Sequence, residues 1–571
     1  MTREPPSKKA TILVIGLLVL AALAVALLWK GANSRSFPGR VHRDKGTKMH
    51  ARRPPRMRGR KGNHNTKSFG AHRGPGMNKG PKKSFQPPAR RKRAPRPPRK
   101  RAPGEYDIVL VVIDTLRADA TTPHGSKEDT TPFLKELVDQ GIIFTKVFSP
   151  GPWTVPSMYS MMTGLYPSEH GICDGVAVGP AIKKKMVGQQ VLPDEAVTLA
   201  ESLKRAGYTT FGVSTNFHLA RQFGFAQGFD DFQGGEFSFI PFPNMAVESL
   251  GEDFRAAPKS FLWLHFFDPH YPYLQVEPWF TEWNKSRFKN YLDMSIEATT
   301  MFYRKKARLG PNDPLDPKHL YSIYKLAVYL ANQSEVLFYG LPAARKYVKD
   351  EHIEFFRASY ASNVRQTDEA VREAFETLGI SDQSLVIVTS DHGEELFHHG
   401  GTGHRRHVSV YQELIHVPLI IRLPGRKSAG TVIDTPVSLI DIYPTLLDLL
   451  GEPVPEELSG VSLKPLMEGG TIPPRTLYSE TKNKRGEART IIEYPWKYIY
   501  NYKKKTKELY NLEKDPGEKN NLEMQMKERV KEMHKRLINW VDKTKPQWPI
   551  MEPAPLSPRD IKKLKKMGYL N

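Results

Sequence analysis

Residues 108–113 read IVLVVI, an unbroken apolar run that is followed by the carboxylate of Asp114. Apolar residues in succession, without polar alternation, are typical of a strand buried on both faces of an α/β sheet. Three more runs share this character: residues 261–267 (FLWLHFF), 385–389 (LVIVT) and 417–422 (VPLIIR). Helical patterns separate these runs, at residues 132–140, 196–206 and 364–378. The sequence therefore predicts an α/β sandwich with a mixed or parallel central sheet.

The positive charge of the chain is concentrated before this predicted domain. The 571 residues carry a formal net charge of +24, and residues 30–104 alone hold 25 Lys and Arg against one acid, Asp44. Residues 1–29 add +2, so residues 105–571 carry −2. A basic face for nucleic acid is therefore not predicted on the folded domain. The lone cysteine, Cys173, excludes an intramolecular disulfide and a thiolate metal cluster.

Two segments precede the domain. After a short tail at residues 1–9, residues 10–29 form an apolar run long enough to cross a bilayer as a helix. The run is longer than the apolar part of a cleavable signal, and no small-x-small site follows it, which predicts an uncleaved transmembrane anchor. Residues 30–104 are rich in Arg, Lys, Pro and Gly, which predicts a disordered linker. This linker suits contact with anionic lipid or another polyanion, whereas its scarcity of aromatic residues disfavours nucleic acid.

Polar side chains follow three of the predicted strands, at the point where each strand ends. Asp114 follows the first run, Asp268 and His270 follow the second, and Asp391 and His392 follow the third. In open α/β sheets, ligands bind beyond the carboxyl ends of the strands. We therefore expect these carboxylates and imidazoles to meet at one edge of the sheet.

A hydroxyl residue stands before a predicted helix in residues 152–170, PWTVPSMYSMMTGLYPSEH. Thr154 precedes Pro156 and a helical pattern that runs to Met162. Threonine is favoured at the N-cap of a helix and proline in its first turn. A hydroxyl there faces free backbone amides, which suits an incoming sulfate or phosphate. On these residues alone, a plain capping role for Thr154 is the simpler interpretation.

The same segment resembles the sulfatase signature Cys/Ser-x-Pro-Ser-Arg followed by Thr-Gly-Arg, here TVPSM at residues 154–158 and TGL at residues 163–165. Further stretches resemble the same family: VVIDTLRAD (111–119), DPHYP (268–272), TSDHGEEL (389–396), YQELIHVPLIIRLPG (411–425), SLIDIYPTLLDLLG (438–451) and ELYNLEKDPGEKNNL (508–522). The chain thus resembles the sulfatase branch of the alkaline phosphatase superfamily over most of residues 105–525. The resemblance implies a catalytic domain at residues 105–453 with a central mixed sheet, and a C-terminal subdomain with a small antiparallel sheet and tail at residues 454–571.

The chain departs from the family at the position of the nucleophile. Sulfatases convert the signature Cys or Ser to formylglycine, and threonine cannot become that aldehyde. The signature Arg is also replaced, by Met158. Thr-bearing relatives in the superfamily, such as lipoteichoic acid synthase-like enzymes, use the threonine oxygen directly on phosphorus. The resemblance therefore implies that Thr154 is the nucleophile, activated by a bound divalent metal.

The family's metal positions are occupied by a different set of side chains. Many sulfatases carry two adjacent Asp at the first position and an Asp-Asn pair at the second, which here read Asp114-Thr115 and Asp391-His392. We predict one divalent metal held by Asp114, Thr154, Asp391 and His392. Fewer carboxylates and one imidazole favour Mn²⁺ or Zn²⁺, with Ca²⁺ or Mg²⁺ as alternatives.

Histidines complete the site implied by the resemblance. His270 occupies the family's Pro-His-x-Pro position, which contacts the substrate anion or the leaving group. His407 lies four residues before Tyr411, where sulfatases have a lysine that contacts the anion, and His404 is a near rival for this role. An imidazole at either position can hold the anion or protonate the leaving oxygen. For His265, His398, His399, His416 and His170 we favour structural roles.

These features predict a hydrolase of sulfate or phosphate esters. One alternative is a membrane-anchored transferase that moves a phosphoryl group to a lipid or glycan headgroup. A second alternative is a non-catalytic scaffold that binds anionic polymers. The basic residues after the anchor would keep the catalytic domain in the cytoplasm by the positive-inside rule. The family resemblance implies the opposite, and we follow it in expecting a single-pass protein of the cell membrane with an extracytoplasmic catalytic domain.

Overall fold

The fold was analysed in a computed structural model. It describes residues 105–290, 300, 304, 309–310 and 349–561, with gaps at 175–176, 179–186, 235–243, 272, 402, 405–407, 484–485, 552 and 560. The chain divides into two units, residues 1–91 and 92–571, and the described residues all belong to the second. The predicted transmembrane anchor and linker therefore lie outside the described residues. Within the part that is described, no helix has the length and apolar character needed to span a membrane.

A central sheet of eight strands confirms the predicted mixed α/β architecture. The strand order is β11-β2-β10-β9-β1-β8-β6-β7. Strand β1 lies between β9 and β8 and is parallel to both, whereas β10 is antiparallel to β9. All four predicted strands are present, within two residues of the expected bounds. The strands are β1 (Ile108–Ile113), β2 (Ile142–Phe144), β6 (Thr209–Val213), β7 (Asp231–Gln233), β8 (Ser260–Phe266), β9 (Leu385–Ser390), β10 (Leu419–Arg422) and β11 (Thr431–Ile433).

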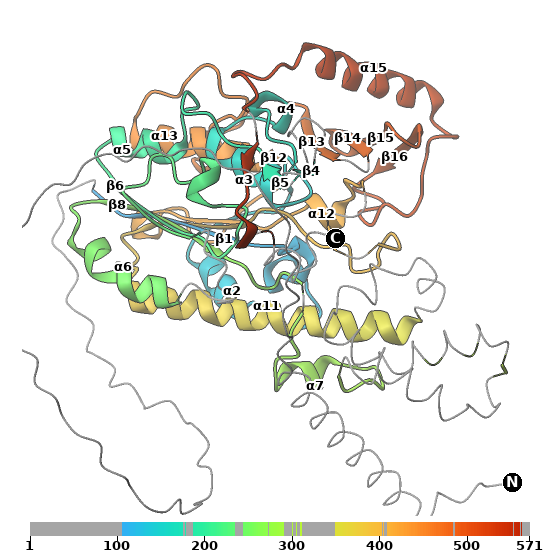
Figure 1. The fold of residues 1–571 in the computed structure, drawn as a ribbon, viewed down its shortest axis with the longest axis horizontal. Helices are drawn as coiled ribbons and strands as arrows, with labels where there is room; N and C mark the ends of the chain where they lie inside the picture. The colour runs from blue at the N-terminus through green and yellow to red at the C-terminus, as the bar shows by residue number, and fades with distance from the viewer. Residues whose placement is uncertain are drawn as a thin grey trace, which may run out of the picture. The chain divides into compact units, whose positions relative to one another are not determined.

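Helices cover both faces of this sheet (Figure 1). One face packs against α3 (Thr154–Thr163), α5 (Leu199–Arg205) and α13 (Ile442–Leu450). The other packs against α2 (Pro132–Asp139), α6 (Asn244–Ala256) and α11 (Asp350–Leu378). Successive side chains of a strand point to opposite faces, so alternate residues of β1 enter the two different cores. Because both faces of β1 are buried, its sequence is a continuous apolar run.

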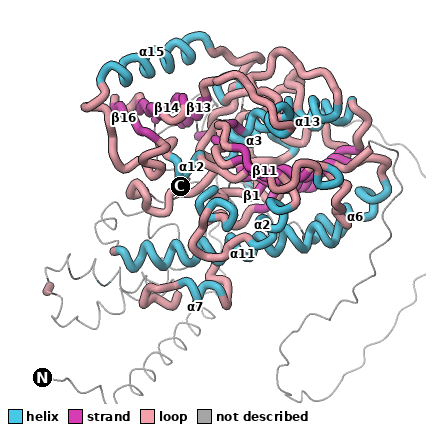
Figure 2. Tube along the Cα trace, turned by 180° about the vertical axis from the view of Figure 1, so that it is seen from behind, coloured by secondary structure: helices cyan, strands magenta, loops and turns pink. Residues whose placement is uncertain are grey.

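A second, antiparallel sheet follows in the C-terminal part, as the resemblance implies. Its four strands lie in sequence order: β13 (Leu477–Asn483), β14 (Gly486–Glu493), β15 (Trp496–Asn501) and β16 (Thr506–Asn511). One face is covered by α15 (Lys527–Lys543), which buries Val530, Met533 and Leu537 (Figure 2). The spacing of these three residues places them on one side of the helix. The other face packs against α12 (Gln412–Ile415), which precedes β10 of the central sheet.

Among the described residues, the remaining α-helices and strands are short. They are β3 (Val147–Phe148), α4 (Pro167–His170), β4 (Ala177–Val178), β5 (Val187–Gln189), α7 (Trp279–Trp283), β12 (Val437–Ser438), α14 (Lys464–Met467) and β17 (Ala554–Pro555).

The register of the three central strands places their carboxyl ends side by side. Ile113, the last residue of β1, pairs with Phe266 of β8 and with Ser390 of β9. The backbone N–H of Asp114 continues this pairing by donating to the Phe266 carbonyl at 2.9 Å. The residues that follow β1, β8 and β9 consequently emerge at the same edge of the sheet.

Candidate active site

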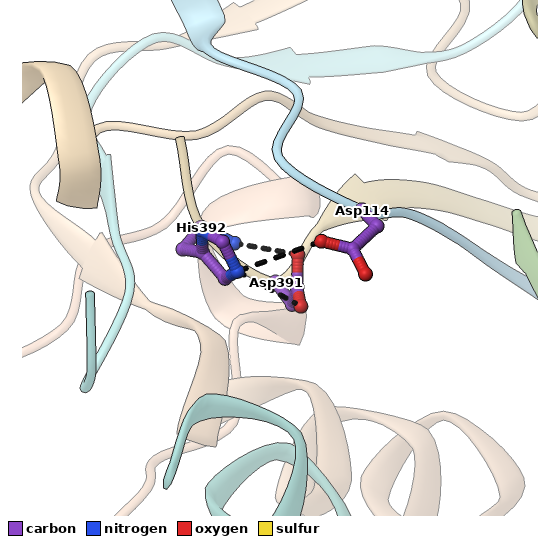
Figure 3. Close-up of side chains that lie close together, drawn as sticks. All are labelled: Asp114, Asp391 and His392. Atoms are coloured by element: carbon purple, nitrogen blue, oxygen red, sulfur yellow. Dashed lines mark hydrogen bonds and ion pairs between the residues drawn. The ribbon is translucent and has the colours of Figure 1, made fainter. Parts of the chain in front are cut away.

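Three of the predicted metal ligands meet at this edge. Asp114, Asp391 and His392 each offer one ligand atom, and these atoms lie within 4.8 Å of one another (Figure 3). Nε2 of His392 is 3.5 Å from Oδ1 of Asp114 and 3.5 Å from Oδ2 of Asp391. All three side chains are completely buried. The close approach of two buried carboxylates to an imidazole nitrogen is a geometry that suits a bound cation.

Each carboxylate is held through one oxygen, which leaves the other directed into the site. Oδ1 of Asp391 accepts hydrogen bonds from the backbone N–H groups of Thr115 (3.2 Å) and His392 (2.8 Å). Oδ2 of Asp114 accepts one from the Asn216 side chain at 2.9 Å. Within the described part of the chain, Oδ1 of Asp114 and Oδ2 of Asp391 have no hydrogen-bond partner. Unpaired buried carboxylate oxygens are costly, so these two atoms fit the role of metal ligands.

The imidazole of His392, like the two carboxylates, is held through one atom and directs another into the site. Its Nδ1 lies 2.8 Å from the carbonyl oxygen of Gly393. Because a carbonyl only accepts, Nδ1 carries the proton and Nε2 presents a lone pair towards the carboxylates. Burial, together with the neighbouring His404, lowers the pKa of His392 well below its ordinary value. A neutral ring with a free Nε2 lone pair is the form that binds a metal.

The two carboxyl groups are destabilised as anions in the protein alone. Burial raises the pKa of Asp391 to about 7. Burial first, and then the charge of Asp391, raise the pKa of Asp114 well above its ordinary value. A divalent cation reverses both effects, because an opposite charge at close range favours the ionised carboxylate. The raised pKa values of these two buried carboxyl groups are therefore consistent with a site that binds a divalent cation.

Thr154 reaches the same point from α3. Its Oγ1 lies 3.4 Å from Nε2 of His392, and the residue is 3% exposed. Thr154 is the first residue of the helix and Trp153 is the N-cap, so the prediction that Thr154 caps the helix is wrong by one residue. Ser157 of the same helix donates to the Asp391 carbonyl at 2.6 Å, which ties α3 to the metal-ligand loop. The hydroxyl is therefore free to serve the site instead of the helix end.

Two of the three predicted substrate-contacting histidines lie beside the predicted metal ligands. The ring of His404 is 4.4 Å from that of His392 and 4.9 Å from that of His270, measured between centroids. Nδ1 of His404 contacts Oε1 of Glu394 at 3.1 Å, and Nδ1 of His270 contacts the Tyr271 carbonyl at 2.6 Å. His407, the other predicted residue, lies outside the described residues.

The structure also brings in residues that sequence reasoning missed. Asn216 follows β6 and holds Asp114, although the two residues are 102 positions apart. Glu394 stands within the TSDHGEEL motif and contacts His404. Asn216 follows β6, which is another strand of the same sheet. A polar residue after a strand was therefore the signal that could have identified it. Met158, at the family's arginine position, is completely buried in the core.

Thr115, between β1 and the site, adopts an unusual backbone conformation. Its φ is 60°, a region that a β-branched residue rarely occupies. The surrounding structure holds it there, since the Tyr360 hydroxyl donates to its carbonyl at 2.7 Å and its own N–H donates to Asp391. Such backbone outliers persist where a functional geometry requires them.

Comparison with known protein families agrees with this geometry. A family model described as Sulfatase matches residues 106–452, which is more than half of the chain. The chain belongs to the sulfatase family. A second model, described as N-sulphoglucosamine sulphohydrolase, C-terminal, matches residues 400–543. This sulfatase-family protein is an ester hydrolase, and its family is metal-dependent.

Individual relatives of this sulfatase-family chain are distant but extensive. It is 25% identical over 467 residues to the Homo sapiens protein named arylsulfatase K, which covers 75% of this chain and 81% of that protein. A solved structure in complex with its substrate, D-glucosamine-2-N,6-O-disulfate, aligns with a TM-score of 0.57 and 21% identity over 77% of this chain and 98% of that one. The phosphonate monoester hydrolase from Silicibacter pomeroyi aligns with a TM-score of 0.55 and 18% identity, covering 78% and 96%. The two structural alignments establish a shared fold.

Proposed function

We propose that this protein cleaves sulfate or phosphate esters with Thr154 as nucleophile, in a site where Asp114, Asp391 and His392 hold a divalent metal. One observation carries the proposal. Oγ1 of Thr154 lies 3.4 Å from the same His392 nitrogen that is 3.5 Å from both carboxylates. The hydroxyl thus reaches the point on which the ligand atoms converge.

The reaction needs an activated hydroxyl and a protonated leaving group. A divalent cation, when bound, supplies positive charge that lowers the pKa of a nearby hydroxyl and offsets charge on the substrate. Thr154 Oγ1 attacks the sulfur or phosphorus atom, so that a bond to this oxygen forms, the hydroxyl proton passes to a neutral imidazole of the site, and the ester bond to the leaving alcohol breaks. Water then attacks the Thr154 ester, releases sulfate or phosphate and restores the hydroxyl.

His270 and His404 are placed to assist both steps. Their rings lie 4.9 Å apart, and that of His404 is 4.4 Å from that of His392. Nδ1 of His270 carries its proton, because the Tyr271 carbonyl accepts from it. Nε2 of a neutral His270 is then an acceptor, so we assign His270 to taking up the Thr154 proton and giving it to the leaving oxygen, and His404 to holding the substrate anion.

The ligand types narrow the choice of metal, and the names of the relatives narrow the class of substrate. Two carboxylates, one imidazole and one hydroxyl favour Mn²⁺ or Zn²⁺ over Ca²⁺ or Mg²⁺. The names arylsulfatase and phosphonate monoester hydrolase, carried by relatives, support a sulfate ester or a phosphorus ester as substrate. Thr154 cannot be converted to formylglycine, which favours phosphorus esters within this pair.

The proposal is tested with the purified full-length protein on p-nitrophenyl sulfate, p-nitrophenyl phosphate and bis-p-nitrophenyl phosphate, each with added Mn²⁺, Zn²⁺ or Ca²⁺. We expect turnover that is lost in Thr154→Ala and kept in Thr163→Ala, a control on the same helix whose hydroxyl donates to the Tyr159 carbonyl. Full activity in Thr154→Ala overturns the role of Thr154. Inactivity of the wild-type protein on every ester would favour the transferase or the non-catalytic scaffold instead.

A further inference from the structure

One buried histidine near the site has no place in the mechanism above. His265 lies in β8 and pairs with Val112 of β1, two residues before Asp114. Its side chain is completely buried, and its ring stacks on Trp263 with centroids 5.8 Å apart. Sequence reasoning favours a structural role for this residue, because it stands inside an apolar strand.

Packing alone does not explain an imidazole at this position. Within the described residues, neither ring nitrogen of His265 has a hydrogen-bond partner. A neutral imidazole carries one N–H donor and one acceptor, and leaving both unpaired in an apolar core costs free energy. A phenyl ring would stack on Trp263 without that cost. A polar function is therefore needed to account for the histidine.

The nearest charged atom identifies that function. Nε2 of His265 is 3.5 Å from Oδ2 of Asp114. The same oxygen accepts the hydrogen bond from Asn216, while Oδ1 on the other side of the carboxylate faces His392. His265 is not part of the group of ligand atoms that converge within 4.8 Å, and it contacts the carboxylate oxygen of Asp114 other than the one near His392. Asn216 and the His265 ring thus both lie at Oδ2 of Asp114, whereas Oδ1 is without a hydrogen-bond partner in the described residues.

We propose that His265 is a positioning residue, whose Nε2–H donates to Oδ2 of Asp114 and, together with Asn216, keeps Oδ1 turned towards the bound metal. This inference rests on the metal site of the proposed function. Outer partners of this kind orient a metal ligand, and their loss typically weakens metal affinity about 10- to 100-fold.

Two substitutions separate the donated hydrogen bond from the packing of the ring. His265→Phe keeps an aromatic ring against Trp263 and removes the donor. His265→Gln keeps an N–H near the position of Nε2. The readouts are the Kd for Mn²⁺ and for Zn²⁺, from equilibrium dialysis of the full-length protein, and the Tm of the metal-stripped protein.

We expect His265→Phe to raise the metal Kd about 10- to 100-fold, and His265→Gln to stay within about threefold of wild type. The metal-stripped Tm of His265→Phe should stay close to that of wild type, because the aromatic ring against Trp263 is kept. His170→Phe is the contrasting control. His170 contacts Ser160 Oγ at 2.9 Å and accepts from the Ile172 N–H at 3.1 Å, so its loss should lower Tm and leave the metal Kd of the folded protein unchanged.

Three outcomes of the metal-binding measurements would overturn the role of His265. An unchanged metal Kd in His265→Phe overturns the inference and leaves the proposed function intact. Equal weakening in His265→Phe and His265→Gln shows that the imidazole itself is needed, which also overturns the donated hydrogen bond. If the wild-type protein binds none of Mn²⁺, Zn²⁺, Ca²⁺ and Mg²⁺ in the same dialysis, the metal site fails and the inference fails with it.

Discussion

The backbone N–H of Thr115 donates a hydrogen bond to Oδ1 of Asp391 across 3.2 Å, and so joins the carboxyl ends of β1 and β9. This bond, with a second from the His392 N–H, occupies one oxygen of the carboxylate. Oδ2 of Asp391 is left without a partner in the described part of the chain. The backbone of two neighbouring strands thereby selects which oxygen is available for a cation.

Asp391→Asn should therefore abolish tight metal binding. Loss of an outer partner weakens metal affinity about 10- to 100-fold, so loss of the ligand itself should weaken it more than about 100-fold. Equilibrium dialysis with Mn²⁺ measures this directly. Asp434→Asn, an exposed carboxylate paired with Lys146, is the matched control and should bind Mn²⁺ like wild type. Tight Mn²⁺ binding by Asp391→Asn would exclude Asp391 from the metal site.

Glu394→Gln should slow catalysis without loss of metal. Glu394 is completely buried, and its carboxylate contacts Nδ1 of His404 at 3.1 Å. A carboxylate in this position orients the ring, so its removal should lower kcat about tenfold. Steady-state kinetics should show this fall together with an unchanged Kd for Mn²⁺, and His404→Ala should lower kcat at least as much. A normal kcat in Glu394→Gln contradicts the role assigned to His404.

Asp268 should make the metal-free protein less stable at high pH. Burial raises the pKa of Asp268 to about 7, well above its unfolded value near 4. The folded state then binds more protons than the unfolded state between about pH 4 and pH 7, so stability falls as pH rises through this window. The full shift corresponds to about 4 kcal/mol.

Asp268→Asn does not titrate, and it should unfold with a free energy similar to wild type near pH 4 and a higher one near pH 8. Urea denaturation of both metal-stripped proteins at the two pH values measures the difference. A difference in stability that does not change with pH would show that Asp268 titrates normally.

A buried ion pair in the C-terminal part should be sensitive to loss of one partner. Nζ of Lys497 lies 2.7 Å from Oε1 of Glu518, and both side chains are completely buried. Lys497→Met leaves the Glu518 charge uncompensated and should lower the free energy of unfolding by about 3–5 kcal/mol. Urea denaturation provides the value.

A substitution of the other partner, Glu518→Gln, supplies the control for this ion pair. Glu518 also accepts the backbone N–H of Gln412 at 2.6 Å, and Glu518→Gln keeps an acceptor for it while removing the charge. The double variant Lys497→Met, Glu518→Gln should recover at least about half of the loss, because no buried charge remains unpaired. If it is no more stable than Lys497→Met alone, packing and not charge accounts for the effect.

The accuracy of the sequence predictions varies with the kind of signal. Strand β1 was predicted to the residue, because burial on both faces requires apolar residues in succession. Strand β16, TKELYN, was not predicted, since its first half is polar and half-exposed. The start of α3 was misplaced by one residue, because Thr154 has the composition of a cap but uses its hydroxyl elsewhere.

The sequence by itself determined the α/β class and the strands that carry Asp114 and Asp391, and it predicted that Thr154 and His392, which lie 3.4 Å apart, share one site. Apolar runs and ordered motifs are local features, so they can be recognised along the chain. Only the tertiary structure decided which oxygen of each carboxylate is free, and that Asn216, Glu394 and His265 surround the ligands. These relationships depend on contacts between residues far apart in the chain, which β1, β6, β8 and β9 bring to one sheet edge. No local pattern encodes such distances, because they arise from the packing of the whole sheet.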